Sequence, residues 1–196
     1  MNSGAQVLLL PARTPDIHGR TVYYLFSVRQ VAEVLLNTMN QRVPFAPPYV
    51  QGVAGWCERV LPVLCLERCL GLELLADRMP PRDVVVRSVV LDDGGQPEEH
   101  YAICRVGAAI RHMELPLDCE PRTVPEGVTD ASCLTAVYDM QASILMVVNL
   151  EKIINAYQPK PKPPSQEATK GSGLFARPSL LWRVGQAEAC DELVRG

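Results

Sequence analysis

Residues 46–72, APPYVQGVAGWCERVLPVLCLERCLGL, decide the fold of this chain. The run VLPVL within them is too short for a helix and contains Pro62, so it predicts a β-strand at or near a sheet edge. Gly52 and Gly55 bracket a turn before this strand, because glycine accepts positive φ at little steric cost. Trp56 falls at the tip of the turn. It is expected either to pack into the core with its indole N–H bonded or to stand exposed as an anchor for a partner.

This stretch resembles the CheW-like domain family. In that family a proline-rich entry is followed by a Gly-Val step, a polar turn, a strand with two hydrophobic residues before Pro-Val, and a closing Leu-Gly-Leu. The chain matches this pattern at Gly52 and Val53, at Val60 to Val63, and at Leu66, Leu70, Gly71 and Leu72. It departs in the polar turn, where Gly55-Trp56-Cys57-Glu58 replaces Asn-Leu-Arg-Gly, and at Cys65, which replaces an Asp.

The resemblance covers residues 6–157 and implies an all-β fold with short helices. The expected CheW-like architecture is two small five-stranded β-barrels, of SH3 or OB type, around a shared hydrophobic core. The implied function is that of a cytoplasmic signalling adapter without catalytic residues or cofactor. Such a domain couples a methyl-accepting chemoreceptor tip to the regulatory domain of a CheA-type histidine kinase, in chemotaxis or a related two-component pathway.

The resemblance also implies where partners bind. A strand edge and apolar patches on one barrel are expected to contact the kinase, and the groove between the barrels is expected to receive the receptor tip. The expected protein-interaction residues are Trp56, Cys57, Glu58, Arg59, Val60 and Pro62. Because Cys57 and Glu58 stand where the family has Arg and Gly, the resemblance points to a divergent member with a different receptor or output.

Composition excludes several other classes. With 196 residues, 47% hydrophobic and 21% charged, the chain can bury one sizeable core. A net charge of −3 and 6% aromatic residues argue against nucleic-acid binding. No apolar run approaches the roughly 20 residues that span a bilayer, so no membrane insertion is expected. The N-terminus lacks the basic region and cleavage site of a secretory signal, which predicts a cytoplasmic protein.

The cysteines and histidines do not indicate an active site. The seven cysteines are odd in number and without repeated spacing, and we expect them to be reduced core residues. Cys65 and Cys69 have no second pair to complete a zinc site, and no histidine lies in a catalytic signature. Two alternatives to the adapter remain open: a sensor that binds a small ligand between the barrels, and an enzyme that uses a reactive cysteine.

Periodicity and caps predict the remaining elements. Strands are expected over 6–12, 21–26, 83–91, 100–106, 133–137 and 143–148, with a hairpin turn at Asp92-Asp93-Gly94-Gly95. Ser27 and Gln30 form a capping-box pattern that predicts a helix over 28–36. Asn149 is expected to cap a final helix over 150–157.

Residues 158–196 lie outside the resemblance. Residues 158–165 read as an extended tether rich in proline and lysine, and apolar residues return at 174–184. This tail is expected to dock on its own domain, to dock on a partner or to be disordered.

Overall fold

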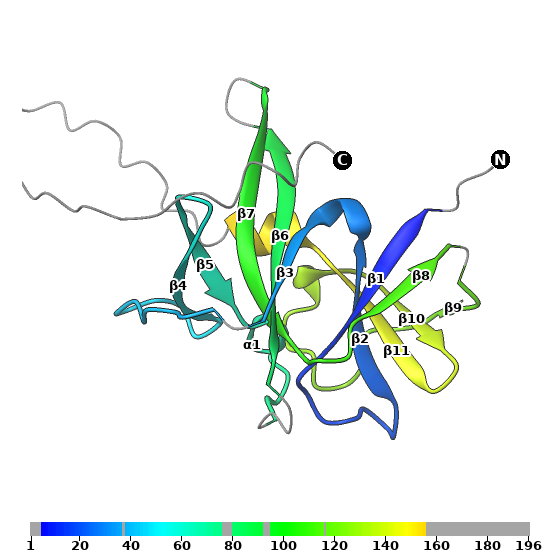
Figure 1. The fold of residues 1–196 in the computed structure, drawn as a ribbon. Coiled ribbons are helices and arrows are strands. Elements are labelled where there is room, and N and C mark those ends of the chain that lie inside the picture. The colour runs from blue at the N-terminus through cyan, green and yellow to red at the C-terminus, as the bar shows by residue number, and fades with distance from the viewer. Residues whose placement is uncertain (1–4, 37, 76–79, 92–94, 116, 156–196) are drawn as a thin grey trace, which may run out of the picture. The chain divides into compact units, whose positions relative to one another are not determined.

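The computed structural model describes residues 5–36, 38–75, 80–91, 95–115 and 117–155. It contains two sheets, with strand orders β8-β1-β2-β11-β10-β9 and β3-β6-β7-β5-β4 (Figure 1). The strands of the six-stranded sheet are β1 (Gln6–Pro11), β2 (Thr21–Ser27), β8 (Arg111–Glu114), β9 (Glu120–Pro121), β10 (Leu134–Met140) and β11 (Ser143–Val148). Those of the five-stranded sheet are β3 (Val31–Leu35), β4 (Val50–Trp56), β5 (Arg59–Leu64), β6 (Arg82–Leu91) and β7 (Pro97–Val106).

The helices are short, as the sequence predicts. They are the α-helices α1 (Leu66–Leu70) and α2 (Leu150–Asn155), and the 3₁₀ turns η1 (Val28–Gln30) and η2 (Ala131–Cys133). The prediction of an all-β fold with short helices, built from two small sheets, is confirmed. One sheet has six strands rather than five because the two-residue β9 pairs with β10.

Strand connectivity interleaves the two sheets. The five-stranded sheet is formed by β3 to β7, which lie between β2 and β8 in the sequence. Neighbouring strands are antiparallel except for β2 with β11 and β5 with β7, so each sheet has one parallel pair. The first and last strands therefore complete the six-stranded sheet around an inserted five-stranded one.

Each sheet is apolar on both faces, which produces three cores. In β6, Val84 and Val86 face a large core shared by both sheets, whereas Val85 faces a smaller core within the five-stranded sheet. In β1, Leu10 faces the shared core and Leu9 faces a small core within the six-stranded sheet. Since alternate residues of a strand point to opposite faces, two small cores flank the shared one.

The helix predicted over 28–36 is wrong. The capping box of Ser27 and Gln30 does form, and the Gln30 side chain accepts the Ser27 N–H at 2.9 Å. It caps only the 3₁₀ turn η1, because the chain then continues as β3, which pairs with β6 from Asp83 to Val86. Two of the five residues of β3 are β-branched valines, which suit a strand, and the ladder with β6 outweighs the helical spacing.

Two other local predictions are confirmed. β6 and β7 form the expected hairpin, paired from Arg82 with Val106 to Leu91 with Pro97, although loop residues 92–94 lie outside the described residues. Asn149 caps α2, since its side-chain oxygen accepts the Lys152 N–H at 3.0 Å. The tail over 158–196, and any docking by it, lies outside the described residues. Within the described residues, no helix is long and apolar enough to cross a membrane.

The burial of the cysteines agrees only in part with the expectation that they are core residues. Cys65, Cys104 and Cys133 are buried, as expected, but Cys57 is exposed. Burial, with Glu67 as a second cause, raises the pKa of Cys65 to about 12. Burial also raises the pKa of Cys104 well above its ordinary value. Both core thiols are therefore held in the protonated, unreactive form.

Candidate interaction surface

The β4–β5 hairpin closes with the two-residue loop Cys57-Glu58, because Trp56 and Arg59 face each other across the ladder. Both loop residues have positive φ, 43° for Cys57 and 61° for Glu58. A two-residue loop of this kind needs positive φ at both positions, which is why Asn and Gly are favoured there. Cys57 and Glu58 therefore hold a strained backbone at an exposed tip.

Replacing Glu58 with glycine should stabilise the protein by about 1 kcal/mol, because glycine adopts positive φ without the steric cost of a Cβ. The measurement is chemical denaturation of the wild type and the variant at one pH and salt. Glu58→Ala is the control, since it removes the carboxylate and keeps the Cβ. If both variants change the free energy of unfolding equally, the charge and not the backbone sets the cost.

Trp56 combines the two expected roles. Its indole N–H donates to the Glu33 carboxylate at 2.6 Å, and its ring lies 5.3 Å from that of Tyr101. The side chain is only half-buried, so part of the ring remains on the surface. Because Glu33 is on β3 and Trp56 on β4, this hydrogen bond links the two edge strands of the five-stranded sheet.

Charged and aromatic side chains continue this surface across the sheet. The Arg59 guanidinium lies over the Tyr101 ring, 5.0 Å from its centroid. The Tyr101 hydroxyl donates to Glu99, which raises the pKa of Tyr101, and burial adds to the shift. Glu99 also pairs with Arg87 at 3.3 Å. We call Trp56, Arg59 and Tyr101 the aromatic cluster; the contacts of Glu33 and Glu99 fix two of its three side chains in place.

The other predicted interaction residues divide into exposed and buried. Cys57 and Glu58 are exposed at the tip, and the Val60 side chain is 73% exposed. Pro62 is buried, so it does not belong to the surface. β5 is the second strand from the edge and pairs with β7 only at Val63 and Leu64. Pro62 thus lies outside the stretch that β7 pairs, which agrees with its lack of an N–H donor.

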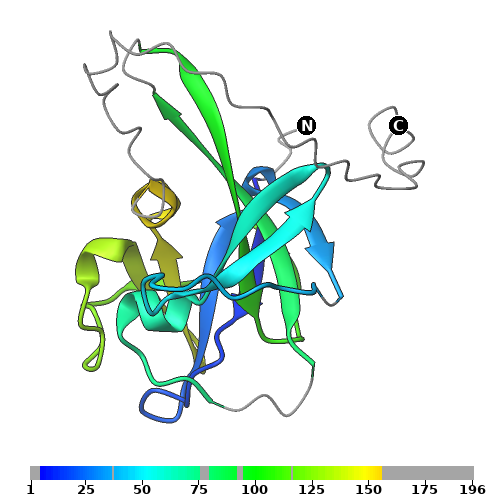
Figure 2. The ribbon, with the colours of Figure 1, turned by 90° about the vertical axis from the view of Figure 1, so that its left-hand side faces the viewer.

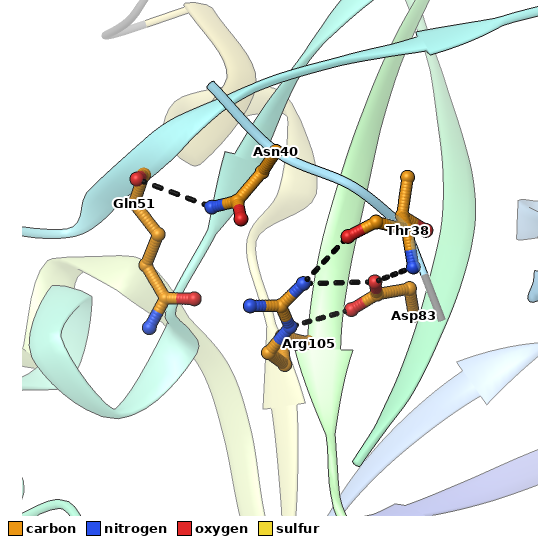
Figure 3. A network of polar contacts seen from close by, with 5 residues as sticks. All are labelled: Thr38, Asn40, Gln51, Asp83 and Arg105. Atoms are coloured by element: carbon orange, nitrogen blue, oxygen red, sulfur yellow. Dashed lines mark hydrogen bonds and ion pairs between the residues drawn. The ribbon is translucent and has the colours of Figure 1, made fainter. Parts of the chain in front are cut away.

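The loop between β3 and β4 is tied to the same sheet by a polar network, drawn in Figure 3. The Arg105 guanidinium binds both carboxylate oxygens of Asp83, at 2.7 and 2.9 Å. Asp83 also accepts the backbone N–H of Thr38 at 3.0 Å, and Asn40 donates to the Gln51 carbonyl at 3.3 Å (Figure 3). The loop thus held exposes two large apolar side chains, Met39 at 93% and Phe45 at 106%.

A backbone bridge attaches the same loop to β4. Gln41 and Val53 exchange two hydrogen bonds of 2.8 Å, which cover part of the free edge of β4. Gly52 makes the approach possible, because a Cβ there would lie 2.4 Å from the Gln41 carbonyl oxygen. The glycine that matches the family pattern is therefore required by a backbone contact.

Asp83 should make stability depend on pH in the acid range. Burial alone would raise the pKa of this carboxyl, but hydrogen bonds from Arg105 and Thr38 hold it below its ordinary value. A carboxyl with a lowered folded pKa stabilises the protein above its unfolded pKa, near 4, and loses that contribution as the pH falls through the folded pKa. Asp83→Asn should therefore cost about 2 kcal/mol at pH 7 and progressively less below about pH 4.

Denaturation of the wild type and Asp83→Asn from pH 7 to 3 tests this expectation. Asp118→Asn is the matched control, because Asp118 has none of these contacts and lies in the loop between β8 and β9. A gap between the wild type and Asp83→Asn that stays constant down to pH 3 would contradict the assignment.

Sequence reasoning missed Glu33, Tyr101 and Arg87. Glu33 fell within the wrongly predicted helix over 28–36. Tyr101 and Arg87 are directly opposite each other on β7 and β6. A register counted from the predicted turn Asp92-Asp93-Gly94-Gly95 would instead have set Arg87 against His100, because the strands pair from Leu91 with Pro97 and so leave one more residue between them. The contact of Tyr101 with Trp56 and Arg59 depends on how β5 meets β7, for which the sequence carries no local signal.

Comparisons with known proteins support this architecture. A family model described as the CheW-like domain matches residues 16–158. Among solved structures, the chain is similar to the scaffolding protein TtCheW from Thermoanaerobacter tengcongensis, with a TM-score of 0.56 and 14% sequence identity. That match covers 76% of this chain and 87% of the other chain, and at this identity it shows the fold alone. No curated protein sequence matches the chain.

Proposed function

The chain belongs to the CheW-like domain family, and from this we propose that it is a cytoplasmic signalling adapter without catalytic activity. In this proposal it couples a methyl-accepting chemoreceptor tip to the regulatory domain of a CheA-type histidine kinase. The aromatic cluster with the Cys57-Glu58 loop binds the kinase domain. The receptor tip binds between the two sheets.

The aromatic cluster is the observation that supports the kinase contact. Trp, Tyr and Arg are the residue types that most often dominate binding energy at protein interfaces. Here they lie together, half-exposed or exposed, with Trp56 bound to Glu33 and Tyr101 bound to Glu99. Side chains already fixed before binding lose less conformational entropy on association, which favours affinity.

The chemistry of the described residues favours binding over catalysis. Burial raises the pKa of three thiols, those of Cys65, Cys69 and Cys104. A raised pKa disfavours the thiolate, which is the form of cysteine that acts as a nucleophile. Across the described ranges, no group of three or more His, Cys, Asp or Glu side chains is arranged to hold a metal ion.

Calorimetric titration with the regulatory domain of the kinase from the same organism tests the proposal. Arg59→Ala should weaken binding about tenfold, because truncating an anchor at an interface costs about 1–2 kcal/mol. Arg111→Ala is a matched control, since Arg111 lies 5.1 Å from the Tyr23 ring centroid in the other sheet. Melting curves of both variants establish that each is folded.

Two results would reject parts of the proposal. A wild-type protein that gives no heat at high micromolar concentration is not an adapter for that kinase. Equal affinity for the wild type and Arg59→Ala would place the contact away from the aromatic cluster and leave the adapter role in place.

A further inference from the structure

The outer half of the β6–β7 hairpin extends past the strands beside it. β6 pairs with β7 along its whole length, whereas β3 pairs with β6 only from Asp83 to Val86. In the part of the chain that the structure describes, residues 87–91 of β6 thus have a strand neighbour on one side only. Figures 1 and 2, at right angles to each other, both show the hairpin standing out beyond β3 and β5.

This free edge is apolar. Val89 is 56% exposed and Leu91 is 67% exposed. The one charged residue of the stretch, Arg87, is satisfied within the chain: its guanidinium donates to the Arg29 carbonyl at 2.7 Å and pairs with Glu99. No charge on the stretch itself is therefore left to repel or to attract an incoming strand.

The two edges of the hairpin differ in their protection against pairing. Edge strands are usually guarded by proline, by charged side chains or by a covering segment. β7 begins with Pro97-Glu98-Glu99, which guards its own edge. The edge of β4 is partly covered by the Gln41 bridge. By contrast, β6 ends in Ser88-Val89-Val90-Leu91, which has neither proline nor charge, and such an edge is a template for another strand.

We propose that residues 87–91 of β6 pair with the same stretch of a second copy of this chain, antiparallel about a two-fold axis at Val89. In this register Val89 faces Val89 of the second copy, Ser88 faces Val90 and Arg87 faces Leu91. No like charges stand opposite each other, which is the arrangement that antiparallel pairs favour.

The distribution of apolar side chains agrees with this partner. Val89 and Leu91 lie on one face of β6, because alternate residues of a strand share a face. A two-fold axis perpendicular to the sheet keeps that face continuous, so the exposed Val89 and Leu91 of both copies form one central stripe. The charged Glu98 and Glu99 lie on β7, one strand away from the new pairing.

The size of the contact sets its strength. Five residues and two large apolar side chains from each copy bury less than the roughly 800 Å² per partner of a standard stable interface. The dimer is therefore weak, with a dissociation constant on the order of 100 μM. A two-fold contact of this kind closes on itself, so association stops at two copies.

Sedimentation of the full chain from about 10 μM to about 1 mM tests the proposal, since this range brackets the expected dissociation constant. The wild type should pass from monomer to dimer. Val89→Lys and Val89→Glu should each stay monomeric, because like charges then face each other at the axis. An equimolar mixture of the two variants should form the dimer again. Val60→Lys is the control, because Val60 is exposed on β5 of the same sheet, and it should dimerise as the wild type does.

Three outcomes would overturn the inference. One is a wild type that remains monomeric at about 1 mM, where a dissociation constant of 100 μM predicts mostly dimer. Another is self-association by Val89→Lys equal to that of the wild type. The third is a mixture of the Lys and Glu variants that stays monomeric, because residue 89 would then not face itself. Unchanged melting curves of the variants, expected for an exposed site, show that none of these results reflects unfolding.

Discussion

Gly52→Ala should lower the free energy of unfolding by about 3 kcal/mol, because an added Cβ overlaps a backbone atom that cannot move freely. The Cβ would lie 2.4 Å from the Gln41 carbonyl oxygen and 2.9 Å from its carbonyl carbon. Relief of the overlap separates β4 from the loop and breaks the two hydrogen bonds between Gln41 and Val53. Exposure of the β4 edge should also increase aggregation on heating.

Gly55→Ala is the matched control for this substitution. Gly55 lies on the same strand, and a Cβ there meets nothing within 4 Å. Thermal melts of the two variants should therefore differ by about 10 °C, given roughly 2–4 °C per kcal/mol for a domain of this size. Equal melting temperatures would show that the loop does not approach β4 as described.

Glu67→Ala should have the larger effect, a loss of about 4 kcal/mol, because it leaves buried hydrogen-bond donors without an acceptor and opens a cavity. Glu67 on α1 is fully buried in the shared core. Its carboxylate accepts the backbone N–H of Arg13 at 2.8 Å and the Cys65 thiol at 3.2 Å. Arg13 lies just after β1 of the six-stranded sheet, and α1 follows β5 of the five-stranded sheet. The Glu67 side chain therefore joins segments that adjoin the two different sheets.

Two further variants sharpen the test of Glu67. Glu67→Gln keeps the side-chain volume and one acceptor for the Arg13 N–H, so it should lose about half as much stability. Glu73→Ala removes an exposed carboxylate close to α1 and should change stability by less than about 0.5 kcal/mol. Urea denaturation of all three at one pH supplies the comparison. A Glu67→Ala protein as stable as Glu73→Ala would refute the role assigned to the buried carboxylate.

The same contact gives a physical reason for one departure from the family pattern. Cys65 stands where the family has an Asp, and its thiol donates to Glu67 in the buried core. An Asp at this position would set two carboxylates against each other in a place where burial already disfavours charge. The sequence shows that Cys65 replaces the Asp of the family pattern. Only the structure shows that the Cys65 thiol lies against the Glu67 carboxylate, which makes a thiol suitable there.

What the sequence could predict depends on the range of the interactions involved. The strand over 60–64 and the Asn149 cap follow from contacts between residues close in the chain, and the structure has both. The turn expected between Gly52 and Gly55 is wrong, because both glycines lie within β4 and the chain turns instead at Cys57-Glu58. The helix over 28–36 failed because the partner of this segment, β6, lies about fifty residues further on. The candidate site divides in the same way, since the Cys57-Glu58 loop is local whereas Glu33 and Tyr101 reach Trp56 from distant strands.

The interleaved order of the strands dictates when this protein can fold as it is synthesised. β2 pairs with β11 at Val22 and Ile144, and the whole five-stranded sheet lies between them in the sequence. Ile144, Met146 and Val148 belong to the shared core, so neither sheet can cover its inward face until β11 has left the ribosome. Two sheets with separate small cores therefore become one cooperative unit, which should unfold in a single transition. The strands that are synthesised before β11 therefore keep the apolar side chains of the shared core exposed until β11 is available to pair.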